Sequence, residues 1–367
     1  MKILMIGWGF PPKIQGGLDT HVYEISKELA KENDILLALP EFNSPGRDSG
    51  GIKIIPIKCR ASGSLVKAVR EYNRNILKTC GNLDFDLIHS HDWFGVEAAE
   101  ILREKTGRPW VFSLHSLEFM RSCREGKSLM ERQEIRGAEK CDKVLTVSEL
   151  MRKEIASRYG INPGKIEVVY NSARIPESEP GKVRKKFGFG KKPMALFLGR
   201  LSNQKGPEYF LRAARLALEK IPEARFMVVG EGHLKEGLEK FASHMGMEGN
   251  VFFTGFVSEK ELGSYYRDAD VFVLPSLHEP FGITVLESLL SGTPAIVSEG
   301  AGVLERLPDM DCVLRVKAGD SRDLAEKLAL ALSKRERVSL AEKEKILRAY
   351  SWEKSAVEIL EVYQKLI

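Results

Sequence analysis

Short runs of apolar residues recur along the whole chain, and each is bounded by polar or glycine-containing segments. These runs alternate with longer segments in which apolar residues return every three or four positions. Strands that are apolar on both faces are typical of parallel sheets covered by helices. The alternation of the two patterns therefore predicts an α/β protein built from doubly wound parallel sheets.

The predicted elements fall into two groups, separated by a stretch rich in Pro, Ser and Glu at 170–181. Before it we expect strands at 1–7, 34–39, 52–57, 87–89, 110–113 and 143–147, and helices at 20–31, 64–80 and 96–106. After it we expect strands at 195–198, 225–229, 251–254, 271–274, 295–297 and 313–315. We therefore predict an N-terminal domain at 1–175, a C-terminal domain at 176–350, and a last amphipathic helix at 351–367.

The stretch 269–298 carries the most informative pattern in the chain. A buried strand is followed by a polar loop, a helix at 283–290 and a second buried strand. Gly292 is expected to end the helix in a left-handed conformation. Two carboxylates flank the helix start, Glu279 just before it and Glu287 about a turn inside.

The start of this helix predicts an anion site. The amides of Gly282, Ile283 and Thr284 would point outward, where a helix N-terminus attracts a phosphate. A phosphate with carboxylates on either side would fit a nucleotide-sugar, whose hydroxyl-rich ends surround a charged middle. An ordinary helix start with one acidic residue stabilised by the helix dipole explains the same pattern.

Basic residues follow the first strand of the second group. Arg200 and Lys205 lie in a glycine-containing loop at a strand's carboxyl end, which suits a diphosphate, although two such residues are also common as surface charges. The segments at 230–232 and 254–257, the second containing Gly255 and Phe256, follow later strands. They are candidates for lining a nucleotide pocket or for tight turns.

The N-terminal half lacks the motifs of familiar nucleotide-binding folds. G-x-G-x-x-G is absent and no Gly-Lys-Ser/Thr occurs, but Gly16 and Gly17 could present bare amides to a phosphate. Asp92 and His115 follow two predicted strands at their carboxyl ends. A helix cap for Asp92 and a structural role for His115 are the alternatives to ligand contact.

Composition excludes several classes of protein. At 367 residues with 43% hydrophobic and 29% charged residues the chain is globular, and a net charge of +5 does not indicate nucleic acid. Five cysteines without C-x-x-C spacing predict reduced thiols in the cytoplasm. A basic stripe on the helix at 64–80 (Lys67, Arg70, Arg74, Lys78) is either a solvated face or a weak contact with an anionic membrane surface.

Three motifs together carry a resemblance. Glu279 and Glu287 form E-x7-E, Lys13 to Leu18 resembles a Lys-x-x-Gly-Gly-Leu loop, and Arg200 with Lys205 matches Gly-Arg-Leu…Lys-Gly. Nearly the whole chain resembles the retaining glycosyltransferases of family 4 and, less closely, glycogen and starch synthases. The segment starting at Tyr170 departs from the family pattern, since Ser172 and Arg174 replace Gly and Asp.

The resemblance implies a hexosyltransferase with the GT-B architecture, in which two Rossmann-like domains face each other across a cleft and the last helix returns to the first domain. It implies a UDP-, ADP- or GDP-sugar donor, with glucose as the sugar and an α-glucan as acceptor. No obligatory metal is expected, because no Asp-x-Asp metal motif follows a strand at the predicted site. The sequence Asp309-Met-Asp311 lies in a later loop. Alternatives are a nucleotide-sugar epimerase, a transferase for lipid-linked acceptors, a dehydrogenase and a silent binding protein.

The resemblance also assigns roles to residues. Phosphates would contact Arg200, Lys205, Gly16, Gly17 and the amides of Gly282, Ile283 and Thr284. Glu287 would hold the ribose, and Gly255 with Phe256 the base. Glu279 and His115 would contact the transferred sugar, and Asp92 the acceptor.

Overall fold

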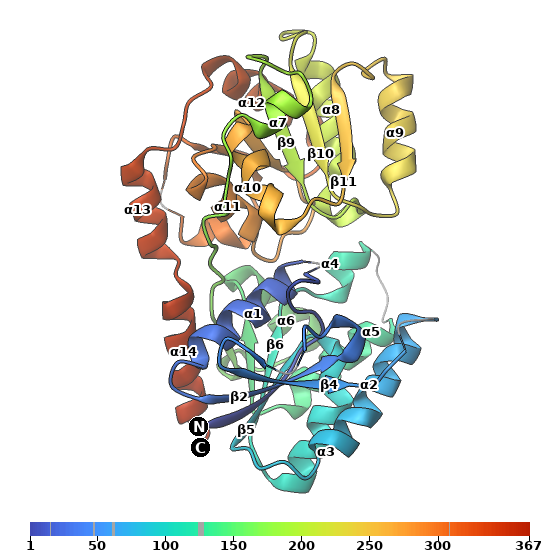
Figure 1. Cartoon of the computed structure of the whole chain (residues 1–367), viewed down its shortest axis with the longest axis vertical. Coiled ribbons are helices and arrows are strands. Elements are labelled where there is room, and N and C mark those ends of the chain that lie inside the picture. The colour runs from blue at the N-terminus through green and yellow to red at the C-terminus, as the bar shows by residue number, and fades with distance from the viewer. Residues whose placement is uncertain (15, 47, 61–62, 124–127, 308) are drawn as a thin grey trace. The chain divides into compact units, whose positions relative to one another are not determined.

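The computed structural model describes residues 1–14, 16–46, 48–60, 63–123, 128–307 and 309–367, and its contacts divide the chain into two compact units (Figure 1). The N-terminal unit contains most of the chain up to Asn171 together with the last segment, Ser351–Ile367. The C-terminal unit contains Ser172–Tyr350 and the short segment Met120–Cys123.

A mainly parallel sheet forms the centre of the N-terminal unit. In the described residues it has eight strands: β1 (Lys2–Ile6), β2 (Asp34–Pro40), β3 (Asp48–Ser49), β4 (Ile52–Ile57), β5 (Leu87–His91), β6 (Trp110–Leu114), β7 (Lys143–Thr146) and β8 (Ile166–Val168). Their order is β3-β4-β2-β1-β5-β6-β7-β8, and only the β3–β4 pair is antiparallel. The order reverses between β1 and β5, which makes this a doubly wound sheet.

Helices cover this sheet. They are α1 (Gly17–Leu29), α2 (Leu65–Cys80), α3 (Val96–Thr106), α5 (Leu129–Lys140), α6 (Glu149–Tyr159) and α14 (Trp352–Gln364), with 3₁₀ turns η1 (Glu41–Asn43), η2 (Trp93–Gly95) and η3 (Pro163–Lys165). The short helix α4 (Glu118–Ser122) is divided between the two units, since its residues from Met120 onward are grouped with the C-terminal unit. α3 packs beside α2 and α5, whereas α14, red in Figure 1, packs against α1. The hydroxyl of Tyr363 on α14 lies 2.5 Å from Nδ1 of His89 on β5, so the last helix belongs to the core of this unit.

The C-terminal unit has a second parallel sheet. Its described strands are β9 (Met194–Leu198), β10 (Arg225–Val229), β11 (Val251–Gly255), β12 (Val271–Leu274), β13 (Ala295–Ser298) and β14 (Val313–Val316), in the order β11-β10-β9-β12-β13-β14. All neighbouring strands are parallel. Here the order reverses between β9 and β12.

The helices of this unit are α7 (Lys182–Lys186), α8 (Pro207–Ala217), α9 (Lys235–His244), α10 (Glu259–Asp268), α11 (Ile283–Leu290), α12 (Ser321–Lys334) and α13 (Leu340–Ala349), with η4 (Asn203–Lys205) and η5 (Gly302–Glu305). α8 packs against α12 and α9, and α10 packs against α11 and α7. Phe197, Phe210, Phe226 and Leu328 are almost fully buried between the sheet and α8 and α12. Each such side chain contributes about 1.5–3 kcal/mol by leaving water.

The predicted fold class is confirmed, and most predicted elements are present. β4, β10, β12, α3 and α11 have the predicted bounds. Ser64 caps α2 and Ser351 caps α14, each accepting a backbone amide, as expected for serine at a helix start. α1 begins at Gly17 rather than at Thr20, because the carbonyl of Gly16 already accepts the amide of Thr20.

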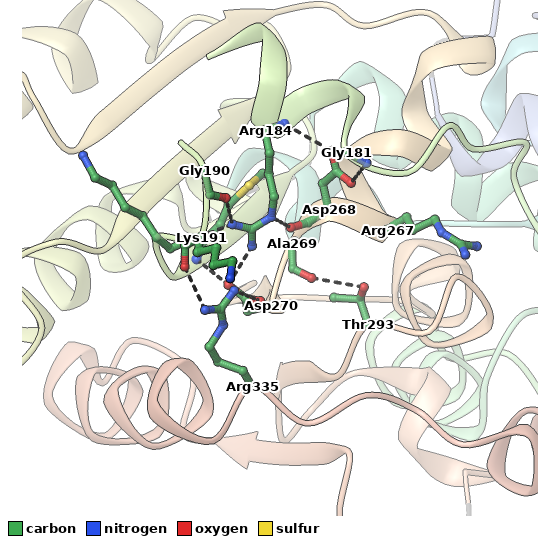
Figure 2. A network of polar contacts seen from close by, with 12 residues as sticks. Gly181, Arg184, Gly190, Lys191, Arg267, Asp268, Ala269, Asp270, Thr293 and Arg335 are labelled. Atoms are coloured by element: carbon green, nitrogen blue, oxygen red, sulfur yellow. Dashed lines mark hydrogen bonds and ion pairs between the residues drawn. The ribbon is translucent and has the colours of Figure 1, made fainter. Parts of the chain in front are cut away.

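A network of polar contacts fixes the beginning of the C-terminal unit to its sheet (Figure 2). The Asp268 carboxylate accepts the amide of Gly181 at 2.6 Å, just before α7. Arg184 on α7 lies 2.8 Å from Asp270, whose carboxylate also accepts the amide of Met194 at 2.7 Å. Met194 begins β9 and Asp270 directly precedes β12, so the network clamps the amino ends of the two central strands.

Two further findings concern the cysteines and the length of the helices. All five cysteines are free. In the residues that the structure describes, no helix combines the length and apolar character needed to cross a membrane.

Candidate active site

The carboxyl ends of β9 and β12 meet where the strand order of the C-terminal sheet reverses. Open α/β sheets bind their ligands outside the carboxyl ends of the strands, at such a topological switch point. The chain that leaves β9 carries Arg200 and Lys205. The chain that leaves β12 carries Glu279 and Gly282. The fold therefore brings four predicted site residues to one edge of one sheet.

The two loops pack directly on each other. The amide of Leu277 donates to the carbonyl of Gln204 at 2.8 Å. Gly206 has φ 66°, and a Cβ there would lie 2.2 Å from the carbonyl oxygen of Pro275. Only glycine fits this left-handed conformation and this close approach. The loop that carries Lys205 is thereby held against the loop that leads to Glu279.

Lys205 and Glu279 form an ion pair. Lys205 Nζ lies 2.7 Å from Glu279 Oε2, and the Ser276 hydroxyl donates to the same oxygen at 2.9 Å. Glu279 is only 5% exposed, so its carboxylate requires a countercharge. The ammonium group keeps two N–H donors and the carboxylate keeps Oε1 for a ligand. Sequence reasoning placed both residues at the site but did not predict that they pair.

The start of α11 presents free amides. Gly282 has φ 108°, and its carbonyl accepts the amide of Val285 at 3.0 Å. Within the described chain, the amides of Gly282, Ile283 and Thr284 donate no hydrogen bond. Unpaired amides at a helix N-terminus, together with the helix dipole, form an anion-binding site.

The rear of this loop is anchored, which keeps the amides in place. The amide of Gly302, at the start of η5, donates to the carbonyl of Glu279 at 3.2 Å. The amide of Val303 donates to the carbonyl of Phe281 at 2.9 Å. The loop is therefore attached to η5 through two backbone hydrogen bonds.

Glu287 lies one helical turn further along α11 and is partly buried. Burial raises the pKa of its carboxyl to about 7, while a hydrogen bond from the Tyr266 hydroxyl at 2.7 Å acts in the opposite direction. Glu287 therefore changes charge near neutral pH, and a ligand can shift that equilibrium. Sequence reasoning missed Tyr266, which lies on α10 in a segment without a motif.

Arg200 and Phe256 are both exposed, and Arg200 has no partner among the described residues. Phe256 is 71% exposed and follows Gly255, the last residue of β11. Gly255 has φ 73°, and its carbonyl accepts the amide of Gly230 at 2.9 Å. A guanidinium and an aromatic ring at this edge of the sheet are suited to a phosphate and a base, respectively.

In the N-terminal unit, the predicted residues also follow strands at the switch point. Gly16 directly precedes α1 and Gly17 is its first residue, and both are exposed. Asp92 follows β5, is 5% exposed and has φ 48°. Its carboxylate does not cap η2 but accepts the amide of His115 at 2.8 Å. Asp92 therefore positions the backbone of the segment that carries His115.

His115 belongs to a buried cluster of four histidines, with His21 on α1 and His89 and His91 on β5. Nδ1 of His91 lies 3.1 Å from Nε2 of His115. Burial lowers the pKa of His21 to about 4 and that of His89 to about 3, and it places those of His91 and His115 well below the ordinary value. All four rings are therefore neutral at physiological pH. The sequence analysis singled out only His115; His89-x-His91 on a buried strand was a signal for the others.

Two family descriptions match the chain. Residues 181–349 match "Glycosyl transferases group 1", and residues 15–173 match "Glycosyltransferase Family 4". An uncharacterized glycosyltransferase of Methanocaldococcus jannaschii is 30% identical over 99% of this chain and 98% of the relative. The chain belongs to glycosyltransferase family 4.

Further relatives agree with this assignment. The D-inositol 3-phosphate glycosyltransferase of Nocardioides sp. is 26% identical to this transferase, over 95% of its chain and 85% of the relative. Among solved structures, sucrose-phosphate synthase from Thermosynechococcus elongatus superposes with a TM-score of 0.83 at 20% identity, covering 100% of this chain and 98% of the other. Anabaena HepE in complex with UDP and glucose gives 0.81 at 20% identity, with full coverage of both. The transferase therefore has the GT-B fold.

Proposed function

We propose that this transferase moves glucose from a nucleotide diphosphate to a hydroxyl of a carbohydrate acceptor, with retention of the anomeric configuration. The observation that carries the proposal is the cluster at the switch point of the C-terminal unit. Lys205, Glu279 and the free amides from Gly282 to Thr284 lie on one edge of one sheet, where α/β proteins bind nucleotides.

The leaving diphosphate would be stabilised by Arg200, Lys205 and the amides of α11. Preorganised cations and amides aimed at a developing negative charge lower the barrier without reorganising during the reaction. A phosphate arriving here would compete with Glu279 for the Lys205 ammonium group. The released carboxylate of Glu279 would then accept a hydrogen bond from a hydroxyl of the transferred sugar.

The nucleotide half of the donor would contact Glu287 and Phe256. A carboxylate accepts two hydrogen bonds from a ribose diol, and the exposed ring of Phe256 offers a face for the base. In the N-terminal unit we assign Gly16 and Gly17 to the phosphates, His115 to the sugar and Asp92 to the acceptor side. These assignments rest on the family motifs.

Uridine diphosphate glucose is the first donor to test, because the similar HepE structure contains UDP and glucose. For the acceptor we propose an α-glucan. The names of the relatives indicate phosphorylated compounds as the alternative, since one acts on D-inositol 3-phosphate and another is a sucrose-phosphate synthase. We expect no obligatory metal, because Arg200, Lys205 and the helix amides can neutralise the diphosphate.

The test begins with the purified protein and no acceptor. UDP-, ADP- and GDP-glucose, with the matching mannose and N-acetylglucosamine donors, are screened for slow release of the nucleotide diphosphate. The best donor is then combined with maltooligosaccharides and with sugar and inositol phosphates, and the anomeric proton of the product is followed by NMR. An inverted anomeric configuration would contradict retention. Epimerised donor without acceptor would indicate an epimerase, and no consumption of any donor would contradict the proposal.

A second candidate acceptor is a lipid-linked saccharide. Lys67, Arg70, Arg74 and Lys78 are exposed on one face of α2 and have no ion-pair partner among the described residues. Each basic residue near an anionic membrane contributes about 1 kcal/mol. Four should therefore give clear flotation with phosphatidylglycerol vesicles and none with phosphatidylcholine. Replacing all four by glutamine should abolish flotation, and equal flotation would exclude this surface.

A further inference from the structure

Three buried imidazoles of the N-terminal unit each have a ring nitrogen without a partner. These atoms are Nε2 of His21, Nε2 of His91 and Nδ1 of His115. The residues are 2%, 0% and 8% exposed. A buried polar atom without a partner costs about 1–3 kcal/mol, so native interiors contain few of them. For His21 the unpartnered atom is the one ring nitrogen left for a ligand, because its Nδ1 contacts Asn171.

The fourth ring of the cluster provides an internal comparison. His89 contacts the Tyr363 hydroxyl with Nδ1 and the Ser113 hydroxyl, at 2.7 Å, with Nε2. Both of its nitrogens are satisfied by the protein. His21, His91 and His115 are also the three rings that each place one nitrogen near the others. For His91 and His115 the facing nitrogens are Nδ1 and Nε2, not the unpartnered atoms. One nitrogen from each lies within 4.8 Å of the others.

The hydrogen bonds determine which nitrogens can act as ligands. Nδ1 of His21 lies 2.7 Å from Oδ1 of Asn171 and must donate to it, so Nε2 carries a lone pair. Nδ1 of His91 and Nε2 of His115 are 3.1 Å apart and share one proton. Two zinc-bound nitrogens in a tetrahedral site are about 3.3 Å apart, given Zn–N distances of about 2.0–2.1 Å. The 3.1 Å separation of the His91–His115 pair is close to this value, although it is also that of a hydrogen bond, so a metal ion could replace the shared proton with little movement of the rings.

We propose that His21, His91 and His115 bind one divalent transition-metal ion of the zinc class, and that the bound ion inhibits sugar transfer. The ion takes the place of the proton between His91 and His115. That proton moves to Nε2 of His91 or to Nδ1 of His115, whichever of the two lacks one. Each of these two rings therefore stays neutral and keeps one N–H. Nε2 of His21 supplies the third ligand.

The ligand set selects the class of metal. Three imidazoles without a carboxylate suit Zn²⁺, Cu²⁺, Ni²⁺ or Co²⁺, whereas Mg²⁺, Ca²⁺ and Mn²⁺ prefer oxygen ligands. Zinc sites with three protein ligands keep a fourth position for water or another exchangeable ligand. His115 is the least buried of the three residues.

Neighbouring groups support two of the rings in the way that is common at metal sites. A histidine ligand usually donates its other N–H to an oxygen, which fixes the ring and its tautomer. Asn171 does this for His21. Asp92 holds the backbone amide of His115 at 2.8 Å. The rival occupant is one buried water, which could also bond to several of these nitrogens.

The binding test uses the full chain after dialysis against a chelator. Zn²⁺ is titrated in competition with a chromogenic chelator, and Co²⁺ is titrated with absorption spectroscopy. We expect one ion per chain. In His21→Asn the amide replaces Nδ1, so the contact with Asn171 is kept while Nε2 is removed. Affinity should fall at least about tenfold, as for other perturbed metal sites.

His233→Asn and His244→Asn are matched controls, because both histidines are exposed and lie in the C-terminal unit. They should leave the affinity unchanged. No binding in the wild-type chain, or equal affinity in His21→Asn, would mean that the cluster holds only water. Thiolate charge-transfer bands in the Co²⁺ spectrum would move the ion to cysteine and overturn the site. If His21→Asn does not fold, X-ray absorption of the Zn²⁺-loaded wild-type chain decides, and fewer than three imidazole ligands overturns the proposal.

The inhibition rests on the proposed contact between His115 and the donor sugar. With UDP-glucose as donor, stoichiometric Zn²⁺ should reduce turnover at least about tenfold, EDTA should restore it, and Mg²⁺ should have no effect. His21→Asn should turn over donor at the same rate with and without Zn²⁺. Normal turnover with the site filled refutes the inhibition. If no donor is turned over at all, the proposed function fails, while the binding result stands independently.

Discussion

Replacing Glu287 by glutamine tests how this transferase holds its nucleotide. Burial raises the pKa of Glu287 from the ordinary 4.5 to about 7. At about 1.4 kcal/mol per pH unit, this costs at most about 3.5 kcal/mol when the carboxyl is ionised, and less because the side chain is only partly buried. The group contributes stability below about pH 4.5, and this contribution is lost as the pH rises through 7. Glu287→Gln removes that dependence.

The same shift makes nucleotide binding depend on pH. If the ribose hydroxyls donate to Glu287, only the carboxylate form binds well, and binding lowers its pKa. At pH 7 about half of the free chains carry the proton, so binding should release roughly half a proton. Below pH 7 the affinity should fall by up to about tenfold per pH unit. In Glu287→Gln the affinity should be weaker at pH 8 and nearly independent of pH.

The measurement is calorimetric titration with the nucleotide diphosphate of the best donor. Titrations at pH 6, 7 and 8, in two buffers of different ionisation enthalpy, give the number of protons released. Urea unfolding at pH 5 and pH 8 gives the stability of both proteins. The stability of the wild-type chain relative to Glu287→Gln should fall by about 2–3 kcal/mol between these two pH values.

Tyr266→Phe is the matched control. It removes the hydrogen bond that favours the charged form of Glu287, so the pKa of Glu287 should rise and the pH dependence of binding should move to higher pH. Two results together would refute the contact between Glu287 and the ribose. The wild-type chain would bind nucleotide without releasing a proton, and its affinity would depend on pH in the same way as that of Glu287→Gln.

Four other substitutions test the remaining parts of the C-terminal unit. Glu279→Gln should lower kcat strongly and leave the affinity for the free nucleotide diphosphate nearly unchanged. If calorimetry showed the same loss of affinity as in Glu287→Gln, the assignment of Glu279 to the sugar would be wrong. Arg200→Ala should reduce kcat about 10²–10³-fold at saturating donor, with unchanged thermal unfolding, and near-normal kcat would exclude it from the phosphates. Gly206→Ala should reduce kcat and stability together, because its Cβ would lie 2.2 Å from the carbonyl of Pro275; an unchanged enzyme would contradict that packing. Asp268→Ala should destabilise by about 3 kcal/mol in urea while the folded fraction keeps its kcat, because Asp268 holds α7 at the opposite edge of the sheet.

Sequence reasoning predicted the fold well where strands are buried on both faces. The strands Arg225–Val229 and Val271–Leu274 contain no polar residue in their interior and are flanked by turn residues, so the sequence predicted where they begin and end. The residues after strand ends were also predicted as site residues, because parallel strands expose their carboxyl ends at one edge. The strand order could not be predicted from these patterns. That order is what makes β9 and β12 neighbours and brings Lys205 to Glu279.

The contacts that sequence reasoning missed are those that depend on tertiary neighbours. Tyr266 and Glu287 meet because α10 packs against α11, and neither residue carries a local signal of this pairing. The histidine cluster combines α1, β5 and the end of β6, which adjoin only when β1 lies beside β5. His21, alone in a helical pattern, has the spacing of an ordinary core residue, and only its neighbours show otherwise.

The ion pair between Lys205 and Glu279 explains how the two ends of a donor could be bound in order. A buried ion pair adds little net stability, since desolvation offsets the attraction between the charges, so stability alone does not account for this one. A diphosphate carries more negative charge than one carboxylate and would attract Lys205 away from Glu279. Glu279 would then be free to hold the sugar only after the phosphates had arrived. On this reasoning the free nucleotide diphosphate should suffice to separate the pair, whereas glucose alone should not.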